Sequence, residues 1–423
     1  MTDVLIADDP LYEELYDIRR EAAEMGNLVE EDMNPAMGAL RDSGAVHKGF
    51  LRELLGLPHY QRHVAAHGSE GFSCLSFDLC NAAFRDYERF SSRVYARGTG
   101  EAALGILEMD EPLHRAYRAT IQPMFLKPRT LTWWRQRWIN DVVGALIEML
   151  KGQDRADLNF QLCARIPVHT ITRAIGMDGD ASLVFRNALV RSGARIPETE
   201  RRAAAETIER MLLELIAKRR AVPGDDVVTG LTQAVLELPD GATRPLTDRE
   251  IMINARVLML AGGGTTWRQL GITLWALLNR RDQLEAIKAD RGLVDRAIEE
   301  SLRWNPTDPV FSRFVAQDTE LGGLFMPAGS ILEICLGPAN RDPARWDNPD
   351  AYDLHRPLHG HLGFGIGAHQ CMGMNVARSE MHVALNALLD AFPNLRLDPD
   401  SAAPYLTGGL EQRGVSAVPV LLR

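Results

Sequence analysis

The most informative segment of the chain reads Phe364-Gly365-Ile366-Gly367-Ala368-His369-Gln370-Cys371-Met372-Gly373. Glycines at alternate positions permit backbone angles and close approaches that side chains forbid. A loop of this kind can aim several backbone N–H groups at the sulfur of Cys371, and such donors tune a metal-bound thiolate. A helix expected to begin near Met372 would add its dipole at the same place. A lone cysteine beside a turn is usually structural, but this glycine pattern favours a metal-bound thiolate.

The other cysteines point to a reducing compartment. Cys74, Cys80, Cys163 and Cys335 have no regular spacing, and a total of five is not typical of a disulfide framework. The sequence holds no C-x-x-C pair, so a structural zinc site is not expected. We therefore expect a cytoplasmic protein in which Cys371 has the setting that suits a thiolate.

Charge and hydropathy argue against two classes of partner. The net charge is −10, whereas nucleic-acid binding needs a concentrated Lys and Arg face. Residues 1–25 are rich in Asp and Glu and lack an apolar run, so we expect no targeting segment. No window of about 18 uninterrupted apolar residues occurs, and we expect no membrane span.

The pattern of apolar residues predicts a mainly α chain with a small β region, an α+β fold in a single domain over residues 1–423. Spacing of three to four residues predicts the long helices at 132–152, 200–220, 247–280 and 293–304. A hairpin is predicted around a Met-Pro-Ala-Gly turn, and a last strand near the C-terminus: Glu320–Phe325 with Ser330–Cys335, then Ser416–Leu422. Residues 1–30 are expected to be a loosely attached N-terminal segment.

The cysteine stretch resembles the haem-binding loop of the cytochrome P450 family, Phe-Gly-x-Gly-x-His-x-Cys-x-Gly, with every fixed position present. The resemblance implies that the Cys371 thiolate binds the iron of haem b (iron protoporphyrin IX). It also implies that Phe364, Gly365 and Gly373 line the cofactor and that His369 contacts a haem propionate. The fold it implies has a long central helix over a buried haem.

Two further elements support this resemblance. Glu300-Ser301-Leu302-Arg303 alone would be read as a solvated pair on one helical face. It is followed by Tyr352-Asp353-Leu354-His355-Arg356, which resembles the family's aromatic-Asp-x-x-Arg element. The resemblance implies a buried triad of Glu300, Arg303 and Arg356 that ties a helix to the cysteine loop. The segment 339–343, Ala-Asn-Arg-Asp-Pro, also looks like a family segment.

Three cationic side chains are expected around the haem carboxylates. His114 and Arg118 are four residues apart, so they share a helical face. They resemble the family's His-x-x-x-Arg pair, which contacts haem propionates. Arg313 lies ten residues after Arg303 and resembles another propionate partner. Two carboxylates inside a protein need such cations.

The middle of the predicted helix 247–280 reads Ala261-Gly262-Gly263-Gly264-Thr265-Thr266. Glycine costs a helix about 1 kcal/mol relative to alanine, so a run of three needs a reason. The resemblance implies that this segment crosses the haem, with Ala261 against the cofactor and Thr265 and Thr266 in catalysis. A structural reading of Thr265, in which its hydroxyl bonds the carbonyl of Ala261, is compatible with that role.

Position 264 departs from the family, which usually has Asp or Glu before this Thr. With Gly264, proton delivery needs another route. A water chain on Thr265 or Thr266, a substrate hydroxyl or another acid, or a peroxide-driven reaction are the alternatives. Retention of Thr265 favours the first two.

By resemblance, the chain is a haem-thiolate monooxygenase that inserts one atom of O2 into a substrate. The chain has no G-x-G-x-x-G after a strand and no cysteine cluster, so electrons from NAD(P)H are expected through a separate ferredoxin and reductase. Docking near the cysteine face could use Arg118, Arg129 or Lys127. A monomer is expected. The alternatives are a peroxygenase, isomerase or dehydratase on the same fold, a haem-binding sensor, or a haem-free helical protein.

The substrate is expected to be an apolar small molecule, and a steroid, a terpenoid or an aromatic compound would all fit. Its contacts are predicted in five segments: 93–108, 180–195, 254–266, 307–312 and 407–411. Apolar side chains within them favour such a ligand, although core packing explains each one equally well: Val94, Leu104, Leu258, Val310 and Leu410.

Overall fold

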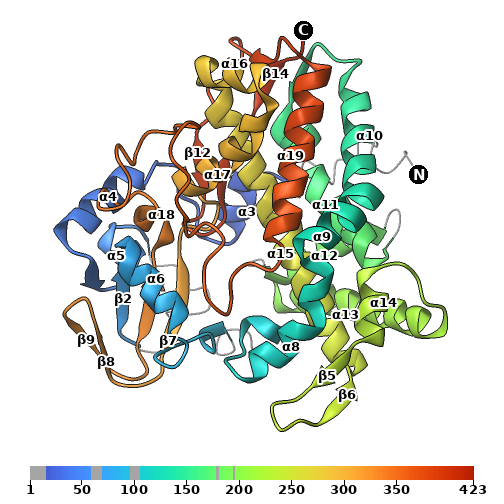
Figure 1. Cartoon of the computed structure of the whole chain (residues 1–423), viewed down its shortest axis with the longest axis vertical. Coiled ribbons are helices and arrows are strands. Elements are labelled where there is room, and N and C mark those ends of the chain that lie inside the picture. Colours follow the sequence, from blue (N-terminus) through green and yellow to red (C-terminus); the bar gives the residue numbers. More distant parts are fainter. Residues whose placement is uncertain (1–15, 59–68, 96–104, 178–180, 194–195) are drawn as a thin grey trace.

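The computed structural model describes residues 16–58, 69–95, 105–177, 181–193 and 196–423. Helices make up most of the fold, and the largest sheet lies to one side of the long helices (Figure 1). The α-helices are α3 (Ile18–Glu24), α4 (Asn34–Ser43), α5 (Leu51–Leu54), α6 (Phe77–Arg85), α8 (Leu113–Ile121), α9 (Lys127–Arg129), α10 (Asn140–Leu150), α11 (Arg165–Ile175), α12 (Ala181–Gly193), α13 (Glu198–Ala221), α14 (Val227–Gln233), α15 (Asp248–Leu278), α16 (Arg281–Ala289), α17 (Val294–Trp304), α18 (Leu336–Ala339) and α19 (Met374–Ala391).

The predicted α+β class is confirmed, and so are the four predicted long helices. Segment 132–152 forms a π-helix, Thr130–Ile139, that runs on into α10. The other three correspond to α13, α15 and α17. Shorter helical turns occupy Gly105–Leu107, Gln122–Phe125, Asn159–Cys163 and Arg291–Leu293.

Helix α15 begins where its sequence provides a reciprocal cap. The Thr247 hydroxyl accepts the Glu250 N–H at 3.3 Å, and the Glu250 carboxylate accepts the Thr247 N–H at 2.7 Å. This capping box satisfies two N–H groups that the helix start would otherwise leave open. The helix then runs through the core and packs against α11, α13, α17 and α19.

A five-stranded sheet positions one of the predicted site residues. Its order is β1 (Val46–Lys48), β2 (Gly71–Cys74), β10 (Ile331–Ile334), β7 (Phe311–Val315) and β3 (Phe90–Ser91). Strand β10 runs parallel to β2 and antiparallel to β7, which places Leu332 opposite Arg313. The smaller strands are β4 (Arg155–Asp157), β5 (Val235–Glu237), β6 (Thr243–Pro245), β8 (Thr319–Leu321), β9 (Leu324–Met326), β11 (Arg396–Leu397), β12 (Leu406–Gly408), β13 (Arg413–Val415) and β14 (Pro419–Leu421).

The predicted hairpin between 320–325 and 330–335 is wrong. The chain reverses earlier, at Gly322 and Gly323, and pairs β8 with β9. Both glycines have positive φ, 58° and 83°, which suits the tight turn of a two-residue hairpin. Strand β10 then leaves to pair with β2 and β7. The predicted last strand is confirmed as β14, which pairs with β11 and β4.

The described part of the N-terminal segment is packed against the fold, in contrast to the expected loose attachment. The ring of Tyr16 meets Trp267 of α15 edge-on, with centroids 6.0 Å apart. Ile18 is 2% exposed, and the Val29 N–H donates to the carbonyl of Gly408 at 2.7 Å. Apolar anchors at 16 and 18 explain this attachment, since each removes apolar surface from water. Residues 1–15 lie outside the described residues.

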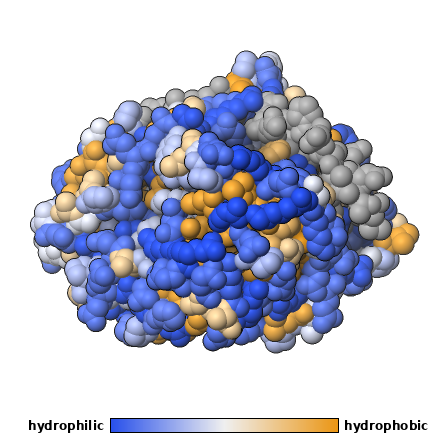
Figure 2. All heavy atoms as spheres, turned by 90° about the horizontal axis from the view of Figure 1, so that it is seen from above, coloured by the Kyte–Doolittle hydropathy of each residue, from blue (hydrophilic) through white to orange (hydrophobic). Residues whose placement is uncertain are grey.

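The largest hydrophobic core lies among the long helices, and a second one lies between the large sheet and α6. Figure 2 shows one end of the molecule, where polar and charged residues predominate and hydrophobic atoms appear near the middle and in patches toward the edge. Among the described helices, we find none whose length and apolar content would allow it to cross a bilayer.

Candidate active site

The cysteine loop folds back on itself just before α19. The Cys371 N–H donates to the carbonyl of Phe364 at 2.9 Å, and the Gly365 N–H donates to Leu362 at 2.8 Å. Gly365 and Gly367 have φ of 62° and 80°, a conformation that favours glycine. A Cβ on Gly367 would lie 2.6 Å from the carbonyl oxygen of Phe84, so the close approach also requires glycine there.

Cys371 differs from the other cysteines in exposure. It is exposed, whereas the other four are buried, and all five thiols are free. Desolvation by the surrounding protein raises the pKa of the Cys371 thiol. The Gly373 N–H, Arg118 and Arg378 act in the opposite direction. Metal coordination deprotonates a thiol outright, so this thiol is suited to become a thiolate on binding a metal ion.

Two arginines hold the loop from either side. Arg118 of α8 donates to the carbonyls of Ala368 and Gln370 at 2.9 and 2.7 Å. Arg378 of α19 stacks over the ring of Phe364, 4.6 Å from its centroid, and pairs with Glu299 at 2.7 Å. Both guanidiniums therefore bring positive charge close to the cysteine.

Four predicted residues converge beside the loop. The rings of His114 and His369 lie 4.0 Å apart, and the His369 ring contacts the carbonyl of Met109 through Nε2 at 2.9 Å. Burial, together with the charges of His114, Arg313 and Arg118, lowers the pKa of His369 to about 3. Burial also lowers the pKa of His114. The structure thus gathers two neutral imidazoles and two guanidiniums at one place.

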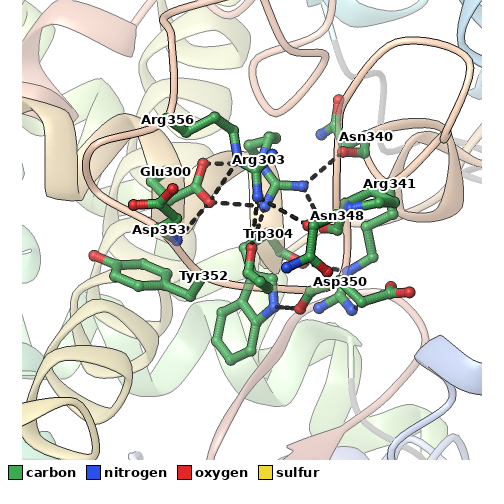
Figure 3. Close-up of polar contacts among 12 residues, drawn as sticks. Glu300, Arg303, Trp304, Asn340, Arg341, Asn348, Asp350, Tyr352, Asp353 and Arg356 are labelled. Atoms are coloured by element: carbon green, nitrogen blue, oxygen red, sulfur yellow. Dashed lines mark hydrogen bonds and ion pairs between the residues drawn. The ribbon is translucent and has the colours of Figure 1, made fainter.

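The predicted triad is confirmed (Figure 3). Arg303 forms two hydrogen bonds with the Glu300 carboxylate, both at 2.8 Å, and Arg356 donates to it at 3.1 Å. The remaining donors of both arginines reach backbone carbonyls between 340 and 351. Asn340 continues this network into the cysteine loop by accepting the Leu362 N–H at 2.7 Å. The Glu300 carboxylate thus bonds both guanidiniums, and backbone carbonyls accept their remaining N–H groups.

The glycine-rich middle of α15 is open on one side. Ala261 is exposed and Thr265 half-buried, although the helix around them is mostly buried. The Thr265 hydroxyl donates to the carbonyl of Ala261 at 3.0 Å, as the structural reading predicted. A Cβ at Gly264 would lie no closer than 3.5 Å to its nearest neighbour, so packing alone does not require glycine there.

Thr266 points toward a buried acid that the sequence analysis missed. Glu380 of α19 is 3% exposed, and its carboxyl faces the hydroxyls of Thr266 and Thr170. Burial raises the pKa of Glu380 to about 8, and the two hydroxyls only partly offset this shift. The signal available in the sequence was an acid nine residues after Cys371 on an otherwise mixed helix, which is weak by itself.

Comparison with known proteins agrees with this geometry. A family model described as cytochrome P450 matches residues 195–407. Cytochrome P450 monooxygenase PikC of Streptomyces venezuelae is 31% identical over 94% of this chain and 93% of its own length. Vitamin D3 dihydroxylase of Streptomyces griseolus is 32% identical over 76% of this chain and 78% of its own.

The chain belongs to the cytochrome P450 family. The structure of cytochrome P450 CYP109Q5 from Chondromyces apiculatus superposes with a TM-score of 0.79 at 25% identity, covering 92% of this chain and 95% of that one. The family implies a haem cofactor, and the chain is an oxygen-incorporating oxidoreductase of the monooxygenase type.

The residues of this P450 fit a haem. Within the described part of the chain, neither Arg118 nor Arg313 forms an ion pair with a carboxylate, so both guanidiniums suit the two haem carboxylates. Arg313 is 5% exposed, and a buried cation of this kind calls for an anionic partner. The exposed thiol of Cys371 suits the iron.

The predicted substrate contacts fall mainly on packed residues. Val310 and Leu410 belong to one buried hydrophobic cluster, and Val94 is also buried. Leu258 is half-buried and packs against the main core. Leu104 lies outside the described residues. Each of the four described side chains therefore has a packing role, whatever its part in substrate binding.

Proposed function

We propose that this chain uses Cys371 to hold a haem b and inserts one atom of O2 into an apolar small molecule. The observation that carries the proposal is an exposed thiol in a Gly-rich loop that has two imidazoles and two guanidiniums beside it. When bound, the haem supplies dioxygen activation, favoured by electron donation from its thiolate ligand. The Gly-rich loop, with Phe364, Gly365 and Gly373, is proposed to line the haem on the cysteine side.

The cluster of His114, Arg118, Arg313 and His369 is proposed to anchor the haem carboxylates. Its arginines form no ion pair with a carboxylate of the described residues. The single N–H of each neutral imidazole already faces a protein acceptor, Glu111 for His114 and Met109 for His369. Charge-assisted hydrogen bonds are stronger than neutral ones, which makes this the main source of orientation. Ala261 is proposed to pack on the opposite face of the haem.

Proton delivery is proposed to use Thr265, Thr266 and Glu380 in place of an acid at 264. Glu380 is mostly protonated at neutral pH because its pKa is about 8, so it can donate a proton. Its carboxyl faces the Thr266 hydroxyl, and Thr265 is the next residue along α15. Water bound to either threonine would complete the route. In this route another acid delivers the proton, which is one of the alternatives to an acid at position 264. A proton route of this kind favours an O2-dependent reaction over a peroxide-driven one.

Electrons are proposed to come from NAD(P)H through a ferredoxin and its reductase. Docking is proposed at Lys127 and Arg129 near the cysteine face. Arg118 is left out because its guanidinium donates to the cysteine loop and to Gln122. Arg129 stacks over Trp133, 4.1 Å from the ring centroid, and stays half-exposed. A cytoplasmic, single-domain monomer is proposed, in agreement with five free thiols.

The substrate is proposed to be a bulky, largely apolar molecule. Two relatives support this, since one is named for vitamin D3 and another for hydroxylating 6-deoxyerythronolide B. A screen with vitamin D3, a macrolide lactone and a fatty acid would seek the low-to-high-spin absorbance shift of the ferric haem. Product analysis with labelled dioxygen then tests the reaction. One labelled oxygen atom in the product supports a monooxygenase, and no label would indicate peroxygenase, isomerase or dehydratase chemistry.

A further inference from the structure

A buried ion pair joins the N-terminal helix α3 to the middle of α15. Arg268 is 1% exposed, and its Nη2 donates to the Glu21 carboxylate at 2.5 Å. Glu21 is itself buried. The Arg186 guanidinium of α12 also faces Glu21, at 3.8 Å. The Glu21 carboxylate therefore lies between two cations, Arg268 on α15 and Arg186 on α12.

The other end of the Arg268 guanidinium reaches the proposed oxygen segment. Its Nη1 donates to the carbonyl of Gly264 at 2.5 Å. That carbonyl and the N–H of Thr265 belong to the same peptide group. A cation bonded to the carbonyl polarises this peptide, because hydrogen bonds in a buried chain strengthen one another. The charge on Arg268 therefore acts on the backbone of Thr265 through one peptide group.

This arrangement gives a reason for the missing acid at 264. A Cβ on Gly264 would lie 3.5 Å from Arg268 Nη1. A carboxylate at 264 would consequently meet the Arg268 guanidinium and compete with Glu21 for it. In this chain the acid that pairs with Arg268 of α15 is Glu21 of α3, and position 264 is a glycine without a side chain.

We propose that Glu21 is a positioning residue for the Gly264–Thr265 segment and acts through Arg268. The N-terminal helix α3 thereby supports the side of the site where dioxygen is handled. Only the expected effect near the haem rests on the proposed function, because the Glu21–Arg268 ion pair is formed by the polypeptide alone.

The test compares E21Q with E24Q in the haem-loaded protein. Glu24 is the matched control, since it lies on the same helix and pairs with Arg20 at the surface. The first readout is hydrogen exchange in a peptide covering 261–268. The second is the C–O stretching frequency of the reduced protein with carbon monoxide as the probe, since this band responds to charge near the bound gas.

E21Q is expected to raise the hydrogen-exchange rate of the 261–268 peptide roughly tenfold, because the buried Arg268 guanidinium loses its charged partner. It is also expected to shift the C–O band, and E24Q should change neither. Equal behaviour of the two variants in both readouts would overturn the inference. A wild-type protein without a thiolate-type spectrum would instead contradict the proposed function, and the exchange arm would still decide the role of Glu21.

The double variant E21Q/R268M separates electrostatic positioning from simple packing. Arg186 still loses Glu21 in this variant, but Arg268 is no longer a buried cation without its carboxylate, so exchange protection of 261–268 should return part of the way toward the wild-type value. The C–O band should stay shifted, because no guanidinium remains on the Gly264 carbonyl. Recovery of both readouts to wild-type values would mean that the pair is only structural and would overturn the proposal.

Discussion

The imidazole rings of His114 and His369 lie with their centroids 4.0 Å apart, one from α8 and the other from the cysteine loop. Two protonated imidazoles at that separation would repel, and burial already lowers the pKa of both. Arg313 and Arg118 supply the permanent positive charge of this corner. The positive charge of this corner therefore lies on the two guanidiniums, which are the groups that two carboxylates require.

Replacing Arg313 by Gln should weaken haem retention. The change removes a buried cation that no carboxylate of the described residues neutralises, and a charge-assisted hydrogen bond contributes about 1.5–3 kcal/mol. Haem loss to a scavenger protein, followed by Soret absorbance, should be roughly tenfold to a hundredfold faster. Arg89→Gln is the control, because Arg89 is partly exposed and pairs with Asp86. Equal loss rates for both variants would contradict the assignment of Arg313.

Glu300→Gln should strongly destabilise the fold. It leaves Arg303 and Arg356 buried without their carboxylate, and breaking such a set typically costs about 3–5 kcal/mol. Denaturant unfolding measures the loss. Glu285→Gln, an exposed acid that pairs with Arg281 and Lys288, should stay within about 0.5 kcal/mol of the wild type. A loss for Glu300→Gln no larger than that of this control would argue against a structural triad.

Glu380→Gln should change how stability depends on pH. The folded pKa of Glu380 is about 8, whereas the unfolded value is about 4.3, so unfolding releases a proton between these values. Wild-type stability therefore falls as pH rises from about 5 to 8, and the variant lacks this contribution. The difference in melting temperature, variant minus wild type, should grow across that range. Glu333, whose pKa burial raises to about 7, is present in both proteins and cancels. A difference that stays constant with pH would show that Glu380 is not protonated by burial.

Gly264→Asp should couple to Glu21→Gln. An Asp at 264 lies within reach of the Arg268 guanidinium and can replace the lost partner, so the double variant should be more stable than the sum of the single effects. The expected coupling is about 0.5–3 kcal/mol in thermal unfolding. Gly264→Ala with Glu21→Gln is the control for helix propensity. Additive effects in the Asp series would mean that position 264 does not reach Arg268.

The sequence predicted those parts of the site that lie in short motifs. The cysteine loop and the Glu300–Arg303 pair depend on residues within about ten positions, and local spacing determines their geometry. Long-range pairings outside the family motifs carried no comparable signal. Glu21 meets Arg268, and Glu380 faces Thr266, only because α3, α15 and α19 pack together.

The fold was predicted best where helices are long. Apolar spacing predicts a helix over 247–280, and α15 spans Asp248–Leu278, so its bounds agree closely with the prediction. The wrong hairpin came from reading Met-Pro-Ala-Gly as the reversal, when Gly322 and Gly323 make the tighter turn. Residues 1–25 lack an apolar run, yet Tyr16 and Ile18 are buried, and Tyr16 meets Trp267, a contact that local sequence does not reveal.

The most direct test of the account is the reduced, carbon monoxide-bound spectrum of the wild type beside Cys371→Ser and Cys163→Ala. Cys163 is buried and serves as a control for a structural cysteine. The account predicts the family's red-shifted Soret band in the wild type and in Cys163→Ala, and its loss in Cys371→Ser. A wild type without that band, or a Cys371→Ser variant that keeps it, would contradict Cys371 as the iron ligand.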